Sequence, residues 1–236
     1  MSVYVYAIAK ESHPLDLKGL EGVGGSAEPH PVRGGSLCAV VSEAPEDVSV
    51  SRDDLQAHFG VVEGLWNKGP ILPMGFGFVA PDEDSVSALL EQRAEEFTQR
   101  LDEFTGRSEF NVKGVQDEAA VLRAVLQDNA QARRLNELTR SGEGTYEDRL
   151  ALGELVAQEV QRRQGAMAEE VLAAVRPVAS AEQVAPSSQQ YFVSASFLVD
   201  DDRSEEFTRA VRELAERYGE GVELRVRGPL PPYSFV

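Results

Sequence analysis

Two stretches of the sequence run through the same order of structural signals, and this repetition limits the fold more than any other feature. Residues 76–114 and 197–228 each give a strand pattern, an acidic helix start, an amphipathic helix and a second strand pattern. Glu96-Phe97-Thr98 in the first stretch corresponds to Glu206-Phe207-Thr208 in the second. Both stretches look like half of a split βαβ, ferredoxin-like sheet. The sequence therefore predicts an α+β fold with two domains whose sheets are backed by helices.

We place the first domain over residues 1–115. Its opening strand, Val3 to Ile8, is β-branched and aromatic without polar alternation, which is typical of a strand buried on both faces. A glycine- and proline-rich stretch over 22–35 is predicted as a surface connection, and a second strand follows it. Ser51 is predicted to cap a helix that ends before Gly69-Pro70.

The second domain is predicted over 116–236. It opens with a helical tract over 118–175 whose glycine-containing break near 141–144 indicates a helical hairpin. Residues 177–190 are predicted as a loop, and Asp202 with Glu205 as a capping box. An extended proline-rich tail closes the domain.

Charge and cysteine content exclude several function classes. The net charge of −17 argues against nucleic acid and anionic membranes as partners, because both would be repelled. No apolar run is long enough to span a bilayer, and the first ten residues lack the order of a signal peptide. Cys38 is the only cysteine, so no intrachain disulfide is possible. Together these features favour a cytoplasmic protein.

The sequence predicts no catalytic, metal or cofactor site. The three histidines have unrelated settings, and no cysteine or histidine lies at ligand spacing from any of them. The glycines at 22–25 lack the lysine of a phosphate loop and the spacing of a dinucleotide fingerprint. Acidic runs such as Asp82-Glu83-Asp84 lie at helix starts, where the helix dipole explains them.

A strand predicted over 71–79 has an unusual pattern. In such a strand Met74, Phe76 and Phe78 share one face, while Gly75 and Gly77 leave the other face bare. A bare face permits close approach by a helix of the same domain, by a ligand or by another chain.

The tail from Gly228 to Val236 contains three prolines, which forbid a helix and favour an extended path. It nevertheless carries Tyr233 and Phe235, an apolar load that is unusual for a disordered segment. We expect a stiff strap that docks on the C-terminal domain with these two aromatic residues as anchors, and contact with a partner is the alternative.

These two segments resemble the GvpL/GvpF family of gas vesicle proteins. The family typically has a Leu-Pro-x-Arg-Phe-Gly strand, matched here by Leu72-Pro73 and Phe76-Gly77, and a terminal Gly-Pro-x-Pro-Pro-Tyr-Ser-Phe, matched from Gly228 to Phe235. Val112-Lys113 and the opening strand are also similar to the family. Gly75 stands where the family usually has arginine, which puts any interaction of that arginine in doubt.

The resemblance implies a minor component or assembly factor of gas vesicles without catalytic activity. Its expected partners are the small hydrophobic shell protein and other gas vesicle accessory proteins, with no small-molecule substrate. A soluble acidic protein could escort the shell protein during nucleation and assembly, either by β-augmentation or by binding a helix in a groove. The candidate partner-binding residues are Met74, Gly75, Phe76, Gly77, Phe78, Tyr233 and Phe235.

Two other function classes stay open. A ferredoxin-like scaffold can hold a small ligand between sheet and helix, so a ligand-sensing regulatory module is the main alternative, with Gly75 and Gly77 as its best feature. An enzyme that uses the acidic clusters is the third reading, and it needs a cleft of perturbed carboxylates.

Overall fold

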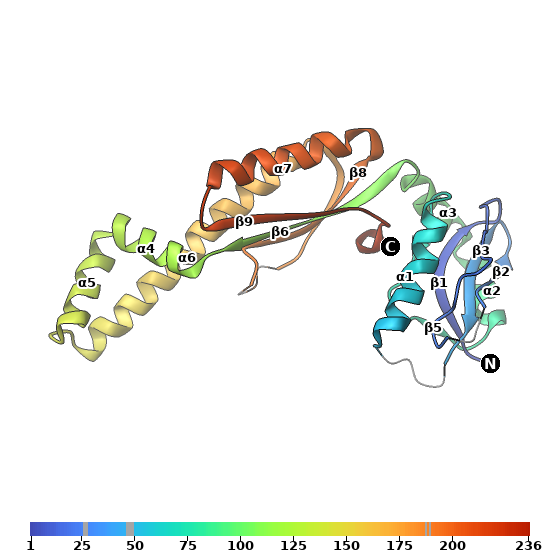
Figure 1. Ribbon diagram of the computed structural model, residues 1–236, viewed down its shortest axis with the longest axis horizontal. Coiled ribbons are helices and arrows are strands. Elements are labelled where there is room, and N and C mark those ends of the chain that lie inside the picture. The colour runs from blue at the N-terminus through green and yellow to red at the C-terminus, as the bar shows by residue number, and fades with distance from the viewer. Residues whose placement is uncertain (26–27, 46–49, 187, 189) are drawn as a thin grey trace. The chain divides into compact units, whose positions relative to one another are not determined.

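The computed structural model describes residues 1–25, 28–45, 50–186, 188 and 190–236. The chain forms two compact units (Figure 1). The first unit consists of residues 1–109 together with 229–236, and the second consists of residues 110–228. The chain therefore leaves the first unit, builds the second, and returns.

The first unit is built on an antiparallel sheet with the order β2-β3-β1-β4, in which β5 also pairs with β1. Its strands are β1 (Val3–Lys10), β2 (His30–Gly34), β3 (Leu37–Glu43), β4 (Leu72–Pro73) and β5 (Val79–Ala80). The connection predicted over 22–35 thus contains a strand that the prediction missed. Val32 and Gly34 are buried while Pro31 and Arg33 are exposed, the alternation of an edge strand, and an edge tolerates Pro31.

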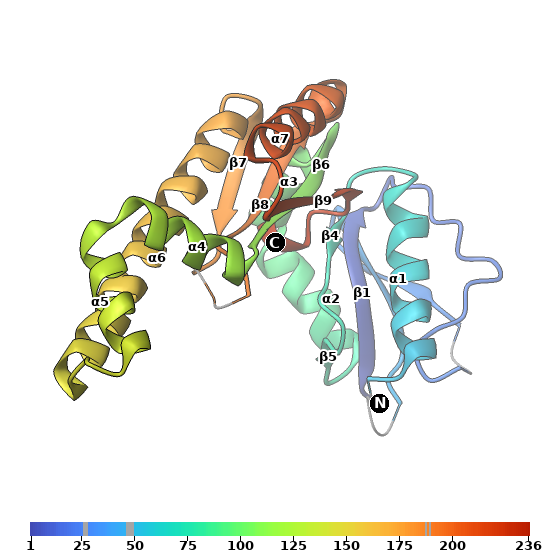
Figure 2. The same ribbon diagram turned by 60° about the vertical axis from the view of Figure 1, so that its left-hand side comes forward.

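Helices cover both faces of this sheet (Figure 2). α1 (Arg52–Trp66) packs on the face that carries Tyr4 and Tyr6, whereas α2 (Glu83–Gln92) and α3 (Ala94–Glu103) lie against the other face. This arrangement explains why β1 is apolar on both sides. The predicted cap of α1 is confirmed, because the Ser51 hydroxyl accepts a hydrogen bond from the N–H of Asp54 at 3.0 Å. The helix predicted after Asp82 is broken in two at Arg93.

The continuous strand that the sequence predicted over 71–79 is not formed. β4 and β5 are separated by a loop in which the N–H of Phe78 donates to the carbonyl of Gly75 and Gly77 has a φ of 89°. Both ends of the loop stay on β1, since the N–H of Met74 donates to Tyr6 and the carbonyl of Phe78 accepts from Val5. Alternation holds only in an unbroken strand, so the expectation of one shared face for Met74, Phe76 and Phe78 is wrong.

The second unit contains a four-stranded sheet with the order β7-β8-β6-β9. Its strands are β6 (Arg107–Gln116), β7 (Ala179–Val184), β8 (Val193–Asp200) and β9 (Val222–Leu230). As predicted, β8, α7 (Ser204–Tyr218) and β9 form a split βαβ, and β6 lies between its two strands. The corresponding prediction for residues 76–114 is wrong, because β5 belongs to the first sheet and β6 to the second. β7 lies in a region predicted as a loop.

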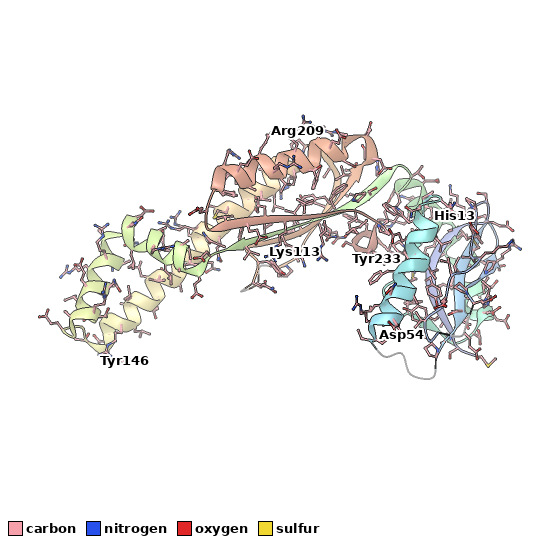
Figure 3. The ribbon with its side chains drawn as sticks, viewed as in Figure 1. His13, Asp54, Lys113, Tyr146, Arg209 and Tyr233 are labelled. Carbon is pink, nitrogen blue, oxygen red and sulfur yellow. The ribbon has the colours of Figure 1, made fainter. Side chains whose placement is uncertain are left out.

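The predicted helical hairpin is present as α5 (Ala130–Ser141) and α6 (Tyr146–Val175), which pack against each other, and a further helix, α4 (Glu118–Asp128), precedes it. The predicted break near 141–144 is present, with Gly142 in the left-handed conformation, and Asn129 adds a second break. Only the last third of α6, from Met167, joins the core under the sheet. Its first half packs with α4 and α5 as an arm that extends beyond the sheet, with Tyr146 at the tip (Figures 1 and 3).

Two further expectations can be compared with the structure. No side-chain cap is formed at the start of α7, so the capping box predicted at Asp202 and Glu205 is wrong; Thr145 and Asp148 form one at α6 instead. Within the described ranges, no helix is both long enough and apolar enough to cross a bilayer.

Candidate functional site

An apolar groove opens on the first unit between the sheet and helices α2 and α3. It encloses about 540 Å³. Its floor comes from β1 and β4 through Val5, Ile8 and Leu72, and its wall from the helices through Leu90 and Phe97. A cavity of this size with a mostly apolar lining is typical of a binding site.

Several large apolar side chains at the mouth of this groove are exposed. Phe78 is 47% exposed, Val79 41% and Leu89 36%. Met74 and Val236 complete the mouth. Single exposed apolar side chains need no explanation, but a group gathered around a cavity marks an interaction surface.

Two arginines of the α3 region stand at the rim of the groove. Arg93 binds the carboxylate of Glu96 through Nε at 2.8 Å and Nη2 at 2.5 Å, and its guanidinium lies 4.7 Å from the centre of the Phe97 ring. The hydrogen bonds from Arg93 lower the pKa of the Glu96 carboxyl. Arg100 lines the groove as well. The rim thus carries more positive than negative side chains, whereas the chain as a whole has a net charge of −17.

A buried aromatic cluster lies on the opposite, α1 side of the sheet. The Tyr4 hydroxyl is 3.0 Å from Nδ1 of the fully buried His58, and it accepts a hydrogen bond from the N–H of Gly77 at 2.9 Å. Phe76 packs edge-on against Tyr4 and His58. Burial lowers the pKa of His58 to about 4, so this side chain is neutral at pH 7.

The predicted site residues of the 74–78 loop are therefore divided between two places. Met74 and Phe78 line the groove, and Phe76 belongs to the aromatic cluster. A Cβ atom added at Gly75 or Gly77 would meet nothing within 4 Å, so no helix packs on the glycine strip in the described structure.

The tail, residues 229–236, docks on the first unit and not on the C-terminal domain as expected. The carboxylate of Glu109 accepts hydrogen bonds from the Ser234 N–H at 2.8 Å and from its hydroxyl at 2.6 Å. Arg100 donates to the carbonyl of Phe235 at 3.3 Å. The Tyr233 ring meets Phe59 edge-on, and Phe235 is only 7% exposed. Tyr233, labelled in Figure 3, and Phe235 are anchors as predicted, but on the first unit.

Sequence reasoning missed Glu109 and Arg100 as partners of the tail. They lie 125 and 135 positions from the residues that they bind. No local pattern marks such a distant pairing, and each residue alone reads as an ordinary charged side chain of a strand or helix.

The geometry gives no support for a metal centre. Within the described parts of the chain, no group of three or more histidine, cysteine, aspartate or glutamate residues is placed to hold a metal ion. The Asp82 carboxylate caps α2 by accepting a hydrogen bond from the Ser85 N–H at 2.7 Å. Nε2 of His30 lies 2.9 Å from a carboxylate oxygen of Glu83.

The fold and these motifs can be compared with known proteins. Residues 2–236 match the family model described as gas vesicle synthesis protein GvpL/GvpF. The chain belongs to this family and is a gas vesicle-associated protein.

Relatives with curated names agree with this assignment. Gas vesicle protein F of Streptomyces sp. strain CB03234 is 43% identical over 240 residues, with all of both chains covered. Gas vesicle protein F of Dolichospermum flosaquae is 24% identical, with 99% of this chain and 96% of the relative covered.

Two crystal structures share the fold. The gas vesicle protein GvpF from Anabaena sp. PCC7120 superposes with a TM-score of 0.83 at 21% identity, covering 99% of this chain and 97% of that one. GvpF from Microcystis aeruginosa gives a TM-score of 0.80 at 22% identity, with coverages of 99% and 98%. The α+β fold expected from the sequence is thereby confirmed.

Proposed function

We propose that this protein is an accessory or minor structural component of gas vesicles that binds the small hydrophobic shell protein in the cytoplasm during vesicle nucleation and assembly. Other accessory proteins of the vesicle are its further partners. The observation that carries the proposal is the apolar groove with its exposed mouth at Met74, Phe78, Val79, Leu89 and Val236. Catalysis has no part in this role.

The need of the shell protein for a binding partner follows from the physics of a gas-filled shell. A shell subunit must present a dry surface to gas, and such a surface aggregates in water unless another protein covers it. A groove that is apolar inside and charged at its rim can cover part of that surface before the subunit is incorporated.

The architecture favours binding of a helix in the groove over addition of a strand. One edge of the first sheet is interrupted by the 74–78 loop, and the strand at the other edge contains Pro31. Short strands, bulges and prolines all hinder pairing with a further strand. Binding in the groove needs no free backbone groups, and its apolar lining suits the apolar face of a short helix.

The charged side chains at the rim of the groove indicate which side chains the bound helix carries. Arg93 and Arg100 border the groove, and each guanidinium has more donors than its present partners use. We infer that the bound helix carries bulky apolar side chains on one face and a carboxylate beside them. Opposite charges at the rim set orientation and the rate of encounter more than affinity.

Co-expression of this chain with the shell protein, followed by affinity purification, tests the proposal. Phe78→Asp places a charge in the mouth of the groove and is expected to reduce recovery of the shell protein at least tenfold. Val184→Asp is the matched control, because Val184 is 49% exposed and lies on β7 of the second unit. Equal recovery with both variants, while both remain folded, would remove the groove from the interaction.

Deletion of residues 229–236 addresses the tail separately. Val236 forms part of the mouth, so recovery should fall, though less than with Phe78→Asp. Unchanged recovery with a folded truncated chain would show that the tail takes no part in shell-protein binding.

A small-ligand-sensing module is the second candidate function. The observation that favours it is the groove volume of about 540 Å³, which lies in the range of small-molecule pockets. A thermal-shift screen with metabolites separates the two, because a ligand that binds the folded chain raises its melting temperature by mass action. A hit that Phe78→Asp abolishes would support this reading.

A further inference from the structure

We propose that the first unit contains a receptor site for the 229–236 segment, and that this site accepts the segment from a second copy of the chain as well as from its own. We call the site the tail clamp and define it as Phe59, Arg100 and Glu109. Copies would then associate by exchanging their tails. This inference does not depend on the proposed binding of the shell protein.

The contacts between clamp and tail have the specificity of peptide recognition. Glu109, 2% exposed, binds the N–H and the hydroxyl of the same serine, Ser234, with its two carboxylate oxygens. Two hydrogen bonds from one residue to one buried carboxyl group depend strictly on geometry. Arg100 fixes the next backbone carbonyl along the tail, and Phe59 receives the preceding aromatic ring. Three consecutive tail residues are therefore contacted, two of them through their side chains.

The tail is also prepared for binding before it docks. Pro231 and Pro232 each have a fixed φ, which leaves little backbone freedom to lose. The residues Tyr233–Phe235 form a short 3₁₀ turn, closed by hydrogen bonds from the Tyr233 N–H to Pro231 and from the Phe235 N–H to Pro232. A peptide that holds its bound shape pays a smaller entropic cost on association.

Sequence connectivity makes exchange between copies possible. Glu109 and Pro229 both belong to the first unit but are separated in sequence by the whole of residues 110–228. The clamp residues all lie within residues 1–109, and the tail supplies only residues 229–236. A tail from another copy can therefore make the same contacts, which is the general basis of domain swapping.

One feature of the bound tail favours release. The hydroxyl of Tyr233 is buried and has no hydrogen-bond partner among the described residues. A buried polar group without a partner opposes docking, so the attachment is weaker than its other contacts would make it.

The concentration of the protein decides whether a clamp binds its own tail or the tail of a second copy. A tethered tail meets its own clamp at an effective concentration in the millimolar range, so isolated copies keep their own tails. Exchange requires crowded copies. The net charge of −17 opposes their approach, and salt that screens this repulsion should promote exchange.

A complementation experiment tests the proposal with two variants. The first lacks residues 229–236 and keeps its clamp, while the second keeps its tail and carries Phe59→Ala with Arg100→Ala. Phe59 is 48% exposed and the Arg100 side chain is 48% exposed, so these changes should leave the fold intact. We expect a 1:1 complex by native mass spectrometry in the mixture and in neither variant alone. Ser234→Ala in the second variant should weaken this complex at least tenfold. Absence of a complex between two folded variants overturns the proposal.

A peptide measurement covers the case in which the truncated variant does not fold. A labelled peptide of residues 228–236 is titrated against the full chain and against the full chain with Tyr233→Ala and Phe235→Ala, whose own tail no longer competes. Binding to the double variant should be at least tenfold tighter, and a Ser234→Ala peptide should lose this preference. Equal binding to both chains, or binding to neither, contradicts the proposal.

Discussion

Glu109 and Ser234, 125 positions apart in sequence, are joined by two hydrogen bonds of 2.8 and 2.6 Å. Both end on the same carboxylate, which is buried on the first unit. This pair holds a tail that contributes Tyr233 to the apolar core of α1 and β1. The stability of the first unit should therefore depend on residues 229–236 as well as on residues 1–109.

Ser234→Ala removes one of these two hydrogen bonds, and we expect the first unit to lose about 1–2 kcal/mol in its free energy of unfolding, because the acceptor is buried and loses a partner. Trp66, the single tryptophan, lies in α1, so its fluorescence in a urea titration follows this unit. Ser180→Ala is the control, since the Ser180 hydroxyl meets Asp200 at an exposed site of the second unit. Equal effects of both substitutions on the Trp66 transition would contradict the prediction.

Tyr233→Phe should stabilise the first unit. The substitution removes a buried hydroxyl that has no partner in the described structure and keeps the ring against Phe59, so a gain of about 1 kcal/mol is expected. Tyr6→Phe is the opposite case, because the Tyr6 hydroxyl binds Ser42 at 2.9 Å and accepts from the Val23 N–H at 2.8 Å. The two variants should move the melting temperature in opposite directions, and a loss of stability in Tyr233→Phe would refute the assignment.

His58 should make the first unit sensitive to acid. Burial lowers its pKa to about 4 in the folded chain, against an ordinary value near 6.5 in the unfolded chain. Between these values the unfolded chain binds the extra proton, so stability is complete above pH 6.5 and falls as the pH decreases toward 4. The full effect is on the order of 3 kcal/mol. Urea midpoints at several pH values should show a steeper decline for the wild type than for His58→Gln, and parallel curves would disprove the role of His58.

The two glycines of the 74–78 loop should respond differently to substitution. A Cβ atom at Gly75 meets nothing within 4 Å, and Gly75 has no positive φ, so Gly75→Arg should change stability by less than about 0.5 kcal/mol. Gly77 has a φ of 89°, and Gly77→Ala should cost about 1–2 kcal/mol from backbone strain alone. A destabilising Gly75→Arg in thermal unfolding would show that this loop is more restricted than its geometry indicates.

Two helix starts were predicted correctly from local chemistry, although the capping box expected at Asp202 and Glu205 was not. Ser51 and Asp82 cap their helices because a side-chain oxygen can reach an N–H two or three residues away, and that spacing is visible in the sequence. The α+β class and the split βαβ of the second unit follow in the same way from strand and helix periodicity.

The sequence-based predictions were wrong where a contact between distant residues, or the backbone conformation of a single residue, determines the structure. β6 looked like a partner of β5, but nothing in a strand's own residues states which sheet it joins. The predicted 71–79 strand is interrupted because Gly77 takes a conformation that glycine permits without requiring. The groove depends on α2, α3, β1 and the tail together, so only Met74 and Phe78 of its lining were anticipated.

The return of the chain to its first unit has a consequence for biosynthesis. Residues 1–109 are translated first, but the hydrogen bonds between Glu109 and Ser234 can form only after residues 110–228 have also been translated. A nascent chain that stalls anywhere in between leaves the surface around Phe59 without its cover, open to chaperones and proteases. The first unit can therefore be completed only after translation has reached the tail.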